Sequence, residues 1–188
     1  MIHRILLLLI TFSLLSLSPI GAQQIEVSGS RKTVRVAGDV VAAVIPAACL
    51  ISTVALSDWE GLKQGSFAGF SSVGLAFILK EITDKERPDM SDDKSFPSMH
   101  TTVSFTGAAF IQRRYGWQWG IPAYAAAGFV GWSRIYGKKH DGWDVAAGAL
   151  MGVISAYLFT KPFAEKYHLS ISPAAGTEHM GFCALLCF

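Results

Sequence analysis

The chain has 188 residues, of which 51% are hydrophobic and only 16% are charged, and its formal net charge is +2. This composition excludes a disordered protein, and the lack of a Lys/Arg-rich stripe argues against a nucleic-acid binder. The length fits one domain. The three cysteines, Cys49, Cys183 and Cys187, are too few for a disulfide framework and show no zinc-like clustering, so neither a metal nor a cross-linked scaffold is expected.

The N-terminal segment is typical of a secretory signal peptide. Arg4 precedes an apolar run, Ile5–Leu17, and small residues end the segment at Ala22, where cleavage is expected. The alternative for residues 1–22 is an uncleaved first transmembrane helix, although the run is short for a bilayer of about 30 Å. In both cases the chain is exported or inserted. The polar stretch 23–39 is expected to be a surface segment.

Five apolar segments follow, and all are expected to be helical. They are Val40–Leu56, Gly65–Leu79, Thr101–Ile111, Trp117–Trp132 and Val145–Thr160. Ala, Gly and Ser are frequent in them, and such small residues let helices approach closely in a membrane. Each uninterrupted run is shorter than the roughly 20 residues of a bilayer span. Either flanking polar residues lengthen the helices or the bundle is soluble, and the near absence of charge favours the membrane.

The sequence therefore predicts an all-α fold. It is a transmembrane helical bundle of five core helices over residues 40–163, or of six helices if the N-terminal segment is uncleaved. The tail, 164–188, is given no role. The connections 80–97 and 133–144 are rich in charged residues and histidine. If the mature N-terminus is outside, successive crossings place both connections on that side, which predicts an active site at the non-cytoplasmic end.

Polar residues gather in three clusters, each at the end of an apolar segment. They are KEITDKERP (Lys80–Pro88), FPSMH (Phe96–His100) and SRIYGKKHDGWD (Ser133–Asp144). Lys80 and Arg87 are two helical turns apart, so a helix that continues to Pro88 would place both cations on one face, where they can meet one anion. Ser98 is an expected N-cap, and the free N–H groups of the helix that follows form an anion site.

The remaining polar residues of the clusters suit catalysis. His140 and Asp144 are at i and i+4, so the carboxylate can accept from one ring nitrogen and leave the other as a base or nucleophile. Arg134 is a bidentate donor suited to phosphate oxygens, and Ser133 is either a phosphate contact or a local cap. The other loop charges are expected to be solvated: Lys85, Lys94, Lys138, Lys139 and Asp141. Convergence of the clusters at one end of a nearly uncharged bundle indicates function.

The clusters resemble the three signature motifs of the type 2 phosphatidic acid phosphatase superfamily: K-x6-RP, PSGH and SR-x5-H-x3-D. The spacing agrees at every polar position, and the resemblance covers roughly residues 40–163. Met99 departs from the pattern because the family usually has glycine there. It puts a bulky side chain beside a backbone N–H that is expected to touch phosphate, which predicts reduced activity or a narrower substrate range.

The resemblance implies a phosphatase mechanism that uses no metal or cofactor. It makes His140 the nucleophile on phosphorus, giving a phosphohistidine, with Asp144 fixing its tautomer. His100 becomes the general acid, which protonates the leaving group and then activates water. The phosphoryl oxygens would be bound by the side chains of Lys80, Arg87, Ser98 and Arg134 and by the N–H of Met99.

The leading functional expectation is a membrane phosphatase that hydrolyses lipid phosphate monoesters or diphosphates at the periplasmic face of a bacterial inner membrane. Candidate substrates are phosphatidic acid, phosphatidylglycerol phosphate, undecaprenyl diphosphate and lipid A. The alternatives are a soluble periplasmic non-specific acid phosphatase, a vanadate-dependent haloperoxidase and a catalytically dead membrane binding protein. The expected partners are therefore the lipid phosphate and membrane lipids, with no nucleic acid, and the motifs leave the oligomeric state open.

Overall fold

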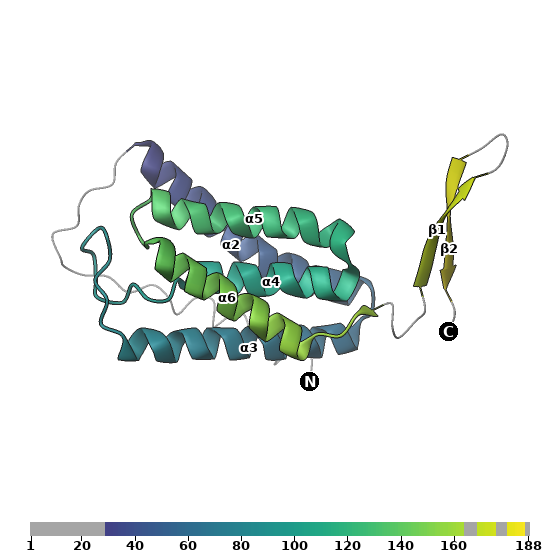
Figure 1. The fold of residues 1–188 in the computed structure, drawn as a ribbon, viewed down its shortest axis with the longest axis horizontal. Helices are drawn as coiled ribbons and strands as arrows, with labels where there is room; N and C mark the ends of the chain where they lie inside the picture. Colours follow the sequence, from purple (N-terminus) through teal and green to yellow (C-terminus); the bar gives the residue numbers. More distant parts are fainter. Residues whose placement is uncertain (1–28, 164–168, 176–179, 187–188) are drawn as a thin grey trace.

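The computed structural model describes residues 29–163, 169–175 and 180–186. Within them the five expected apolar segments are all helical, which confirms the predicted bundle (Figure 1). The helices are α2 (Ser30–Ala55), α3 (Trp59–Ile82), α4 (Met99–Tyr115), α5 (Trp117–Tyr136) and α6 (Gly142–Phe159). The expected signal peptide, residues 1–22, lies outside the described residues.

The helices are longer than the apolar segments that predicted them. Helix α2 begins at Ser30 instead of Val40 and has 26 residues, and α3 begins at Trp59 instead of Gly65 and has 24. Residues 30–39 of the polar stretch are therefore helical, which corrects the expected boundary of the bundle. At a rise of about 1.5 Å per residue, both helices exceed the thickness of a bilayer core. Of the two alternatives that the short apolar runs left open, lengthening by flanking polar residues is therefore the one found for these two helices.

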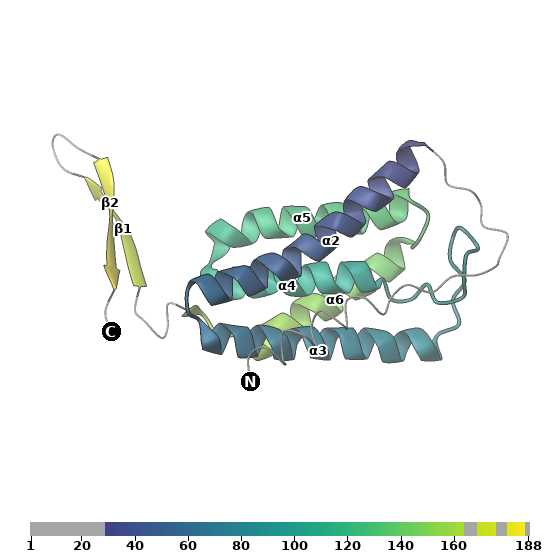
Figure 2. The same cartoon turned by 180° about the vertical axis from the view of Figure 1, so that it is seen from behind.

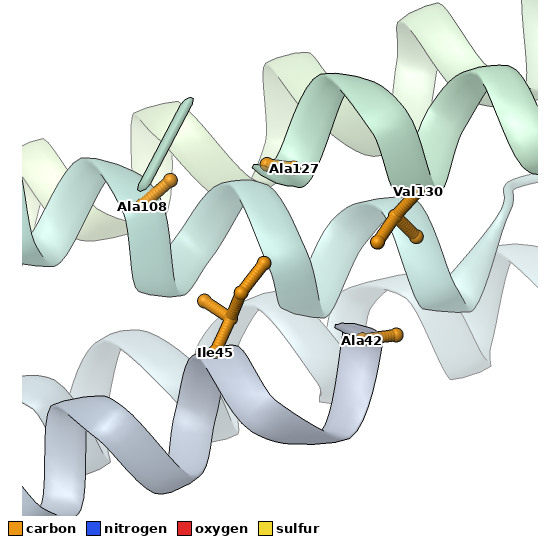
Figure 3. Packing of buried hydrophobic residues seen from close by; sticks show 5 residues of the cluster. All are labelled: Ala42, Ile45, Ala108, Ala127 and Val130. Carbon is orange, nitrogen blue, oxygen red and sulfur yellow. The ribbon is translucent and has the colours of Figure 1, made fainter. Parts of the chain in front are cut away.

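Helix α4 occupies the centre and contacts each of the other four helices. Small side chains make this close packing possible: a Cβ added at Gly148 or Gly152 of α6 would lie 2.7 or 2.6 Å from a backbone oxygen of the α4 segment. One apolar cluster joins α2, α4 and α5 (Figure 3). It consists of Ala42, Ile45, Ala108, Ala127 and Val130. Packing of backbones through small residues is the membrane-type association that the composition predicted.

Three helices, α2, α3 and α6, are long and apolar enough to cross a membrane. Their outward faces carry large apolar side chains, among them Ile51, Phe67 and Leu158, each more than 60% exposed. Exposed tryptophans lie toward both ends of the bundle, including Trp119 near the start of α5 and Trp143 at the start of α6. Apolar outer faces with aromatic residues toward their ends indicate a membrane protein and do not suit a soluble bundle.

Both charged connections lie at the same end of the bundle, at the left of Figure 1 and the right of Figure 2. Residues 83–98 join the end of α3 to the start of α4, and residues 137–141 join α5 to α6. The prediction that one end collects these connections is confirmed. The tail contains an antiparallel hairpin, β1 (Leu169–Ala175) with β2 (Met180–Leu186), which the sequence did not predict and which lies beyond the opposite end of the bundle (Figure 1).

Candidate active site

Four helix ends and two connections bring the expected site residues to one end of the bundle. Lys80 is near the end of α3, Ser98 caps α4, Arg134 is in the last turn of α5, and Asp144 is in the first turn of α6. Arg87 and His140 lie in the connections that precede α4 and α6. Residues that are far apart in the sequence therefore share one polar region.

The first turn of α6 holds Asp144 beside His140. Asp141 is the N-cap: its carboxylate accepts the N–H of Asp144 at 3.0 Å, and the Asp144 carboxylate accepts the N–H of Asp141 at 3.1 Å. This capping box turns Asp144 back toward His140. His140 Nδ1 lies 3.4 Å from Asp144 Oδ2, which is long for a hydrogen bond, and Nδ1 has no hydrogen-bond partner among the described residues.

The surroundings of His140 favour its neutral form. Its side chain is only 4% exposed. Burial lowers the pKa of His140 below its ordinary value; the neighbouring Asp144 carboxylate opposes this shift, and the charges of Arg87 and Lys80 add to it. A buried and neutral imidazole next to a carboxylate can act as a nucleophile or a base near neutral pH.

Ser98 occupies the expected N-cap position of α4, but its hydroxyl does not cap the helix. Its Oγ accepts a hydrogen bond from Thr101 at 2.9 Å, and its N–H donates to the carbonyl of Asp144 at 3.0 Å. The N–H groups of Met99 and His100 have no hydrogen-bond partner among the described residues. The free donors of α4 are therefore those of its first turn, and they remain suited to an anion.

His100 and Arg134 meet at a carboxylate that the sequence did not single out. Asp39 Oδ1 lies 3.1 Å from His100 Nε2 and 2.6 Å from Arg134 Nη1. Arg134 also donates through Nη2 to the carbonyl of Arg35 at 2.6 Å. A Cβ at Gly38 would collide with Arg134 and with Ser133, so glycine lets α2 pack directly against the guanidinium. Helix α2 is thus a wall of the site.

The signal that could have identified Asp39 is its isolation. Once α2 is known to begin at Ser30, Asp39 is the single acidic residue in a 26-residue helix. A carboxylate within a helix that can span a membrane is expensive and usually has a partner and a function. In the predicted division of the chain, Asp39 was the last residue of a surface segment, and nothing marked it as a site residue.

Lys80 and Arg87 converge on one acceptor, although not in the way predicted. Helix α3 ends at Ile82, so it does not continue to Pro88 and Arg87 lies in the connection. Lys80 Nζ donates to the carbonyl of Lys94 at 2.6 Å, and Arg87 Nη2 lies 3.5 Å from the same oxygen. A phosphoryl oxygen could accept hydrogen bonds from both cations in the same way.

Several loop charges that were expected to be solvated are paired. Lys85 Nζ donates to Asp141 at 2.6 Å and to Asp144 at 2.7 Å. Lys139 lies 3.1 Å from the buried carboxylate of Asp89. Lys85, Lys139 and Asp141 are therefore held in ion pairs, which the expectation of solvated loop charges did not include. Nothing in the sequence spacing marks these pairs, because the partners of Lys85 lie 56 and 59 residues away.

Among the described residues, no group of three His, Cys, Asp or Glu side chains is placed to hold a metal ion. The polar groups near His140 are instead cations, free N–H donors and single carboxylates. These cations and N–H groups suit a multiply charged anion, because together they can donate to the oxygens of one phosphoryl group.

Comparison with known proteins gives the family. The model of the PAP2 superfamily matches residues 67–167, which is more than half of the chain, and the protein belongs to this superfamily. This confirms the resemblance found in the three motifs. The matched range contains Lys80, the PSMH segment and the SR-x5-H-x3-D segment, so it includes the polar end of the bundle described above.

Three curated relatives are similar to parts of the chain. Lipid A 4'-phosphatase of Helicobacter pylori is 27% identical over 125 residues, covering 61% of this chain and 63% of that protein. Lipid A 1-phosphatase of Porphyromonas gingivalis is 32% identical over 106 residues, with 50% and 24% covered. Bacitracin transport permease protein BcrC of Bacillus licheniformis is 41% identical over 85 residues, with 43% and 40% covered. The matches span less than two thirds of each relative.

A solved structure has the same fold. The crystal structure of Aquifex aeolicus LpxE superposes with a TM-score of 0.58 at 22% identity, covering 73% of this chain and 94% of that one. At this identity the similarity establishes the helical architecture. The bundle described here is therefore a PAP2-type helical fold.

Proposed function

We propose that the protein is a membrane phosphatase that hydrolyses lipid phosphate monoesters or diphosphates through a phosphohistidine on His140. The observation that carries the proposal is the surroundings of His140: a buried imidazole beside Asp144, with the cations Lys80 and Arg87 close enough to lower its pKa. This combination supplies a neutral nucleophile and the positive charge that a phosphoryl group requires.

In the first step, His140 attacks phosphorus through Nε2, because Nδ1 faces Asp144. An N–P bond forms, the P–O bond to the leaving group breaks, and His100 gives its proton to the leaving oxygen. In the second step, water attacks the phosphohistidine and His100 takes a proton from that water. Inorganic phosphate leaves and the imidazole of His140 is restored. No oxidant, reductant or other reactant is needed.

The phosphoryl oxygens can be bound by protons that the protein's own acceptors leave free. Lys80 donates one hydrogen bond, to the Lys94 carbonyl, and an ammonium group has three protons to give. Arg134 retains a second proton on Nη1 beside the one directed at Asp39. The free N–H groups of Met99 and His100 add donors from the start of α4. Together these groups stabilise the charge that develops in the transition state.

The outer surface of the bundle and the relatives support a lipid substrate. Exposed apolar side chains on α2, α3 and α6 favour a surrounding bilayer, from which a lipid could reach the polar end laterally. Two of the relatives are lipid A phosphatases, which supports lipid A or another lipid phosphate as substrate. We place the polar end at the periplasmic face of a bacterial inner membrane, because the N-terminal segment resembles a signal peptide.

Phosphate release by detergent-purified protein tests the proposal. The substrates are phosphatidic acid, phosphatidylglycerol phosphate, undecaprenyl diphosphate, lipid A and a soluble aryl phosphate, each with a chelator present and with His140→Ala as the control. We expect release from at least one lipid and none from the variant. Faster turnover of the aryl phosphate than of every lipid would reject the lipid specificity, and phosphate release by His140→Ala would reject the phosphohistidine.

A further inference from the structure

Lys85 lies in the connection between α3 and α4, and its ammonium group is directed at the start of α6. Nζ is 2.6 Å from Asp141 Oδ2 and 2.7 Å from Asp144 Oδ1. The backbone is also fixed, because the N–H of Lys85 donates to Thr83 and its carbonyl accepts from Ser95, each at 2.9 Å. In the K-x6-RP motif Lys85 occupies one of the six unspecified positions, so the family resemblance gives it no role.

The carboxylate that Lys85 contacts is fully buried. Asp144 Oδ1 accepts from Lys85, while Oδ2 accepts from the hydroxyl of Ser95 and the N–H of Asp141 and faces His140 Nδ1. Lys85 is the one lysine or arginine that forms an ion pair with Asp144 among the described residues. A buried carboxylate needs compensating partners, and Lys85 supplies the charged one, while Ser95 and the N–H of Asp141 keep hydrogen-bonding the carboxylate.

The charge of Lys85 also affects the imidazole behind Asp144. A carboxylate at 3.4 Å favours the protonated form of His140, and a cation bound to the same carboxylate weakens that attraction. The other charged groups that face His140 are Lys80 on α3 and Arg87 in the connection, both of which disfavour protonation. The hydrogen bonds to Asp141 and Asp144 outweigh burial and raise the pKa of Lys85, so it keeps its charge wherever His140 titrates.

We propose that Lys85 is a positioning residue for the phosphatase reaction, which acts through Asp144 to keep His140 uncharged and correctly oriented. This inference rests on the proposed function, since it concerns the residue that the proposal makes the nucleophile. Asp141 participates by sharing the ammonium group and by capping α6, which fixes the position of Asp144 relative to Lys85.

The test compares Lys85→Met and Lys85→Arg with Lys63→Met, a control that removes an exposed lysine from α3. Two measurements are made on the full chain in detergent: the pH profile of kcat, and the titration of the His140 imidazole by 15N NMR, with its resonance assigned from His140→Gln. We expect Lys85→Met to move the midpoint of His140 protonation, and the acid limb of kcat, upward by about 1 pH unit. Lys85→Arg and Lys63→Met should leave both in place.

A double variant tests whether Lys85 acts through Asp144. Since Asp144→Asn removes the carboxylate, adding Lys85→Met to it should give no further shift of the His140 titration. The double variant also leaves no unpaired buried charge, so it remains informative if Lys85→Met alone does not fold. A further shift in the double variant would overturn the proposal, because Lys85 would then act on His140 directly.

The two measurements separate the proposal from the function on which it rests. If the wild type releases no phosphate from any substrate, the proposed function fails, whereas the NMR titration still decides whether Lys85 controls His140. An unchanged titration in Lys85→Met overturns the proposal. So does a rise in KM with an unchanged pH profile, because Lys85 would then bind the phosphoryl group itself.

Discussion

Both ends of the bundle bury a charged group, but they satisfy it differently. At the end away from the charged connections, Asp58 accepts from Arg114 Nε at 2.7 Å, the N–H of Gly61 at 2.9 Å and the hydroxyl of Tyr115 at 3.1 Å. Arg114 also donates through Nη1 to Lys161 at 2.8 Å. Burial alone would raise the pKa of Asp58, but Arg114 and Gly61 outweigh burial and lower it. The Asp58–Arg114 pair is therefore hydrogen-bonded through all three guanidinium nitrogens, although Arg113 Nε and Thr160 Oγ1 near the same end have no hydrogen-bond partner in the described part of the chain.

The polar end leaves groups unsatisfied. His140 Nδ1 has no hydrogen-bond partner among the described residues, the first N–H groups of α4 are free, and Lys80 and Arg87 share one carbonyl oxygen. A fully hydrogen-bonded buried pair stabilises a fold, whereas free donors, such as the first N–H groups of α4, are expected where a ligand accepts from them. We expect stability to depend on the Asp58–Arg114 pair and chemistry to depend on the polar end, and substitutions at each end can test this division.

The largest effect on activity is expected from Asp144→Asn. An amide in place of the carboxylate cannot hold the Nδ1–H tautomer of His140 or balance its charge in the transition state, so kcat should fall by about 100-fold or more. Kinetics on the best lipid substrate, with circular dichroism to verify folding, measure this. A folded variant with nearly wild-type kcat would remove Asp144 from the mechanism.

Arg114→Met is the matched change at the opposite end. It leaves the buried Asp58 carboxylate without its cation, which should lower the free energy of unfolding by about 3–5 kcal/mol. Specific activity of the folded fraction should stay within about twofold, because Arg114 contacts nothing at the polar end. Denaturant unfolding in detergent and kinetics on the same sample check both statements. Loss of activity without loss of stability would break the division between the ends.

Asp39→Asn tests whether α2, through Asp39, contributes to the candidate active site at the polar end. The substitution keeps the shape of the side chain but removes the charge that His100 and Arg134 share. Because a hydrogen bond to a charged group is worth about 1.5–3 kcal/mol, we expect kcat/KM to fall by about 10- to 100-fold. Steady-state kinetics measure the change. An increase in kcat/KM would instead mean that Asp39 competes with phosphate for Arg134.

From the sequence, it was possible to predict the helices and those candidate site residues that lie close together along the chain. The five helices follow from apolar runs, and Ser98, His140 and Asp144 follow from motif spacing near helix starts. The contacts of Asp39 with Arg134 and of Lys85 with Asp144 join residues 95 and 59 positions apart. Only packing of α2 and of the connections against the bundle creates them, and no local pattern encodes that packing.

Helix ends were also beyond what the apolar pattern could predict. Polar residues extend α2 back to Ser30, whereas α3 stops at Ile82 before Arg87. Both differences arise because hydrogen bonding along the backbone and tertiary contacts, not hydropathy, decide where a helix ends.

Met99→Gly is expected to have a smaller effect than the charge substitutions. Met99 is half-buried at the first position of α4, where its N–H is free for an anion, and we expect its side chain to restrict access of bulky substrates to that N–H. Glycine should raise kcat/KM for the bulkiest lipid phosphates by less than about tenfold, equivalent to at most ~1.4 kcal/mol. The substrate panel described above measures it. Equal changes for bulky and small substrates would show that the side chain does not restrict access.

The smallest effect is the position of the acid limb in the wild-type enzyme. Only neutral His140 can attack phosphorus, so activity rises as pH increases through its pKa. Burial, followed by the charges of Arg87 and Lys80, lowers that pKa below the ordinary value of 6.5, although Asp144 opposes the shift. Activity at pH 6.5 should therefore already exceed half of its maximum. A pH profile of kcat measures this. An acid limb centred above pH 6.5 would mean that the Asp144 carboxylate stabilises protonated His140 more than burial and the two cations destabilise it.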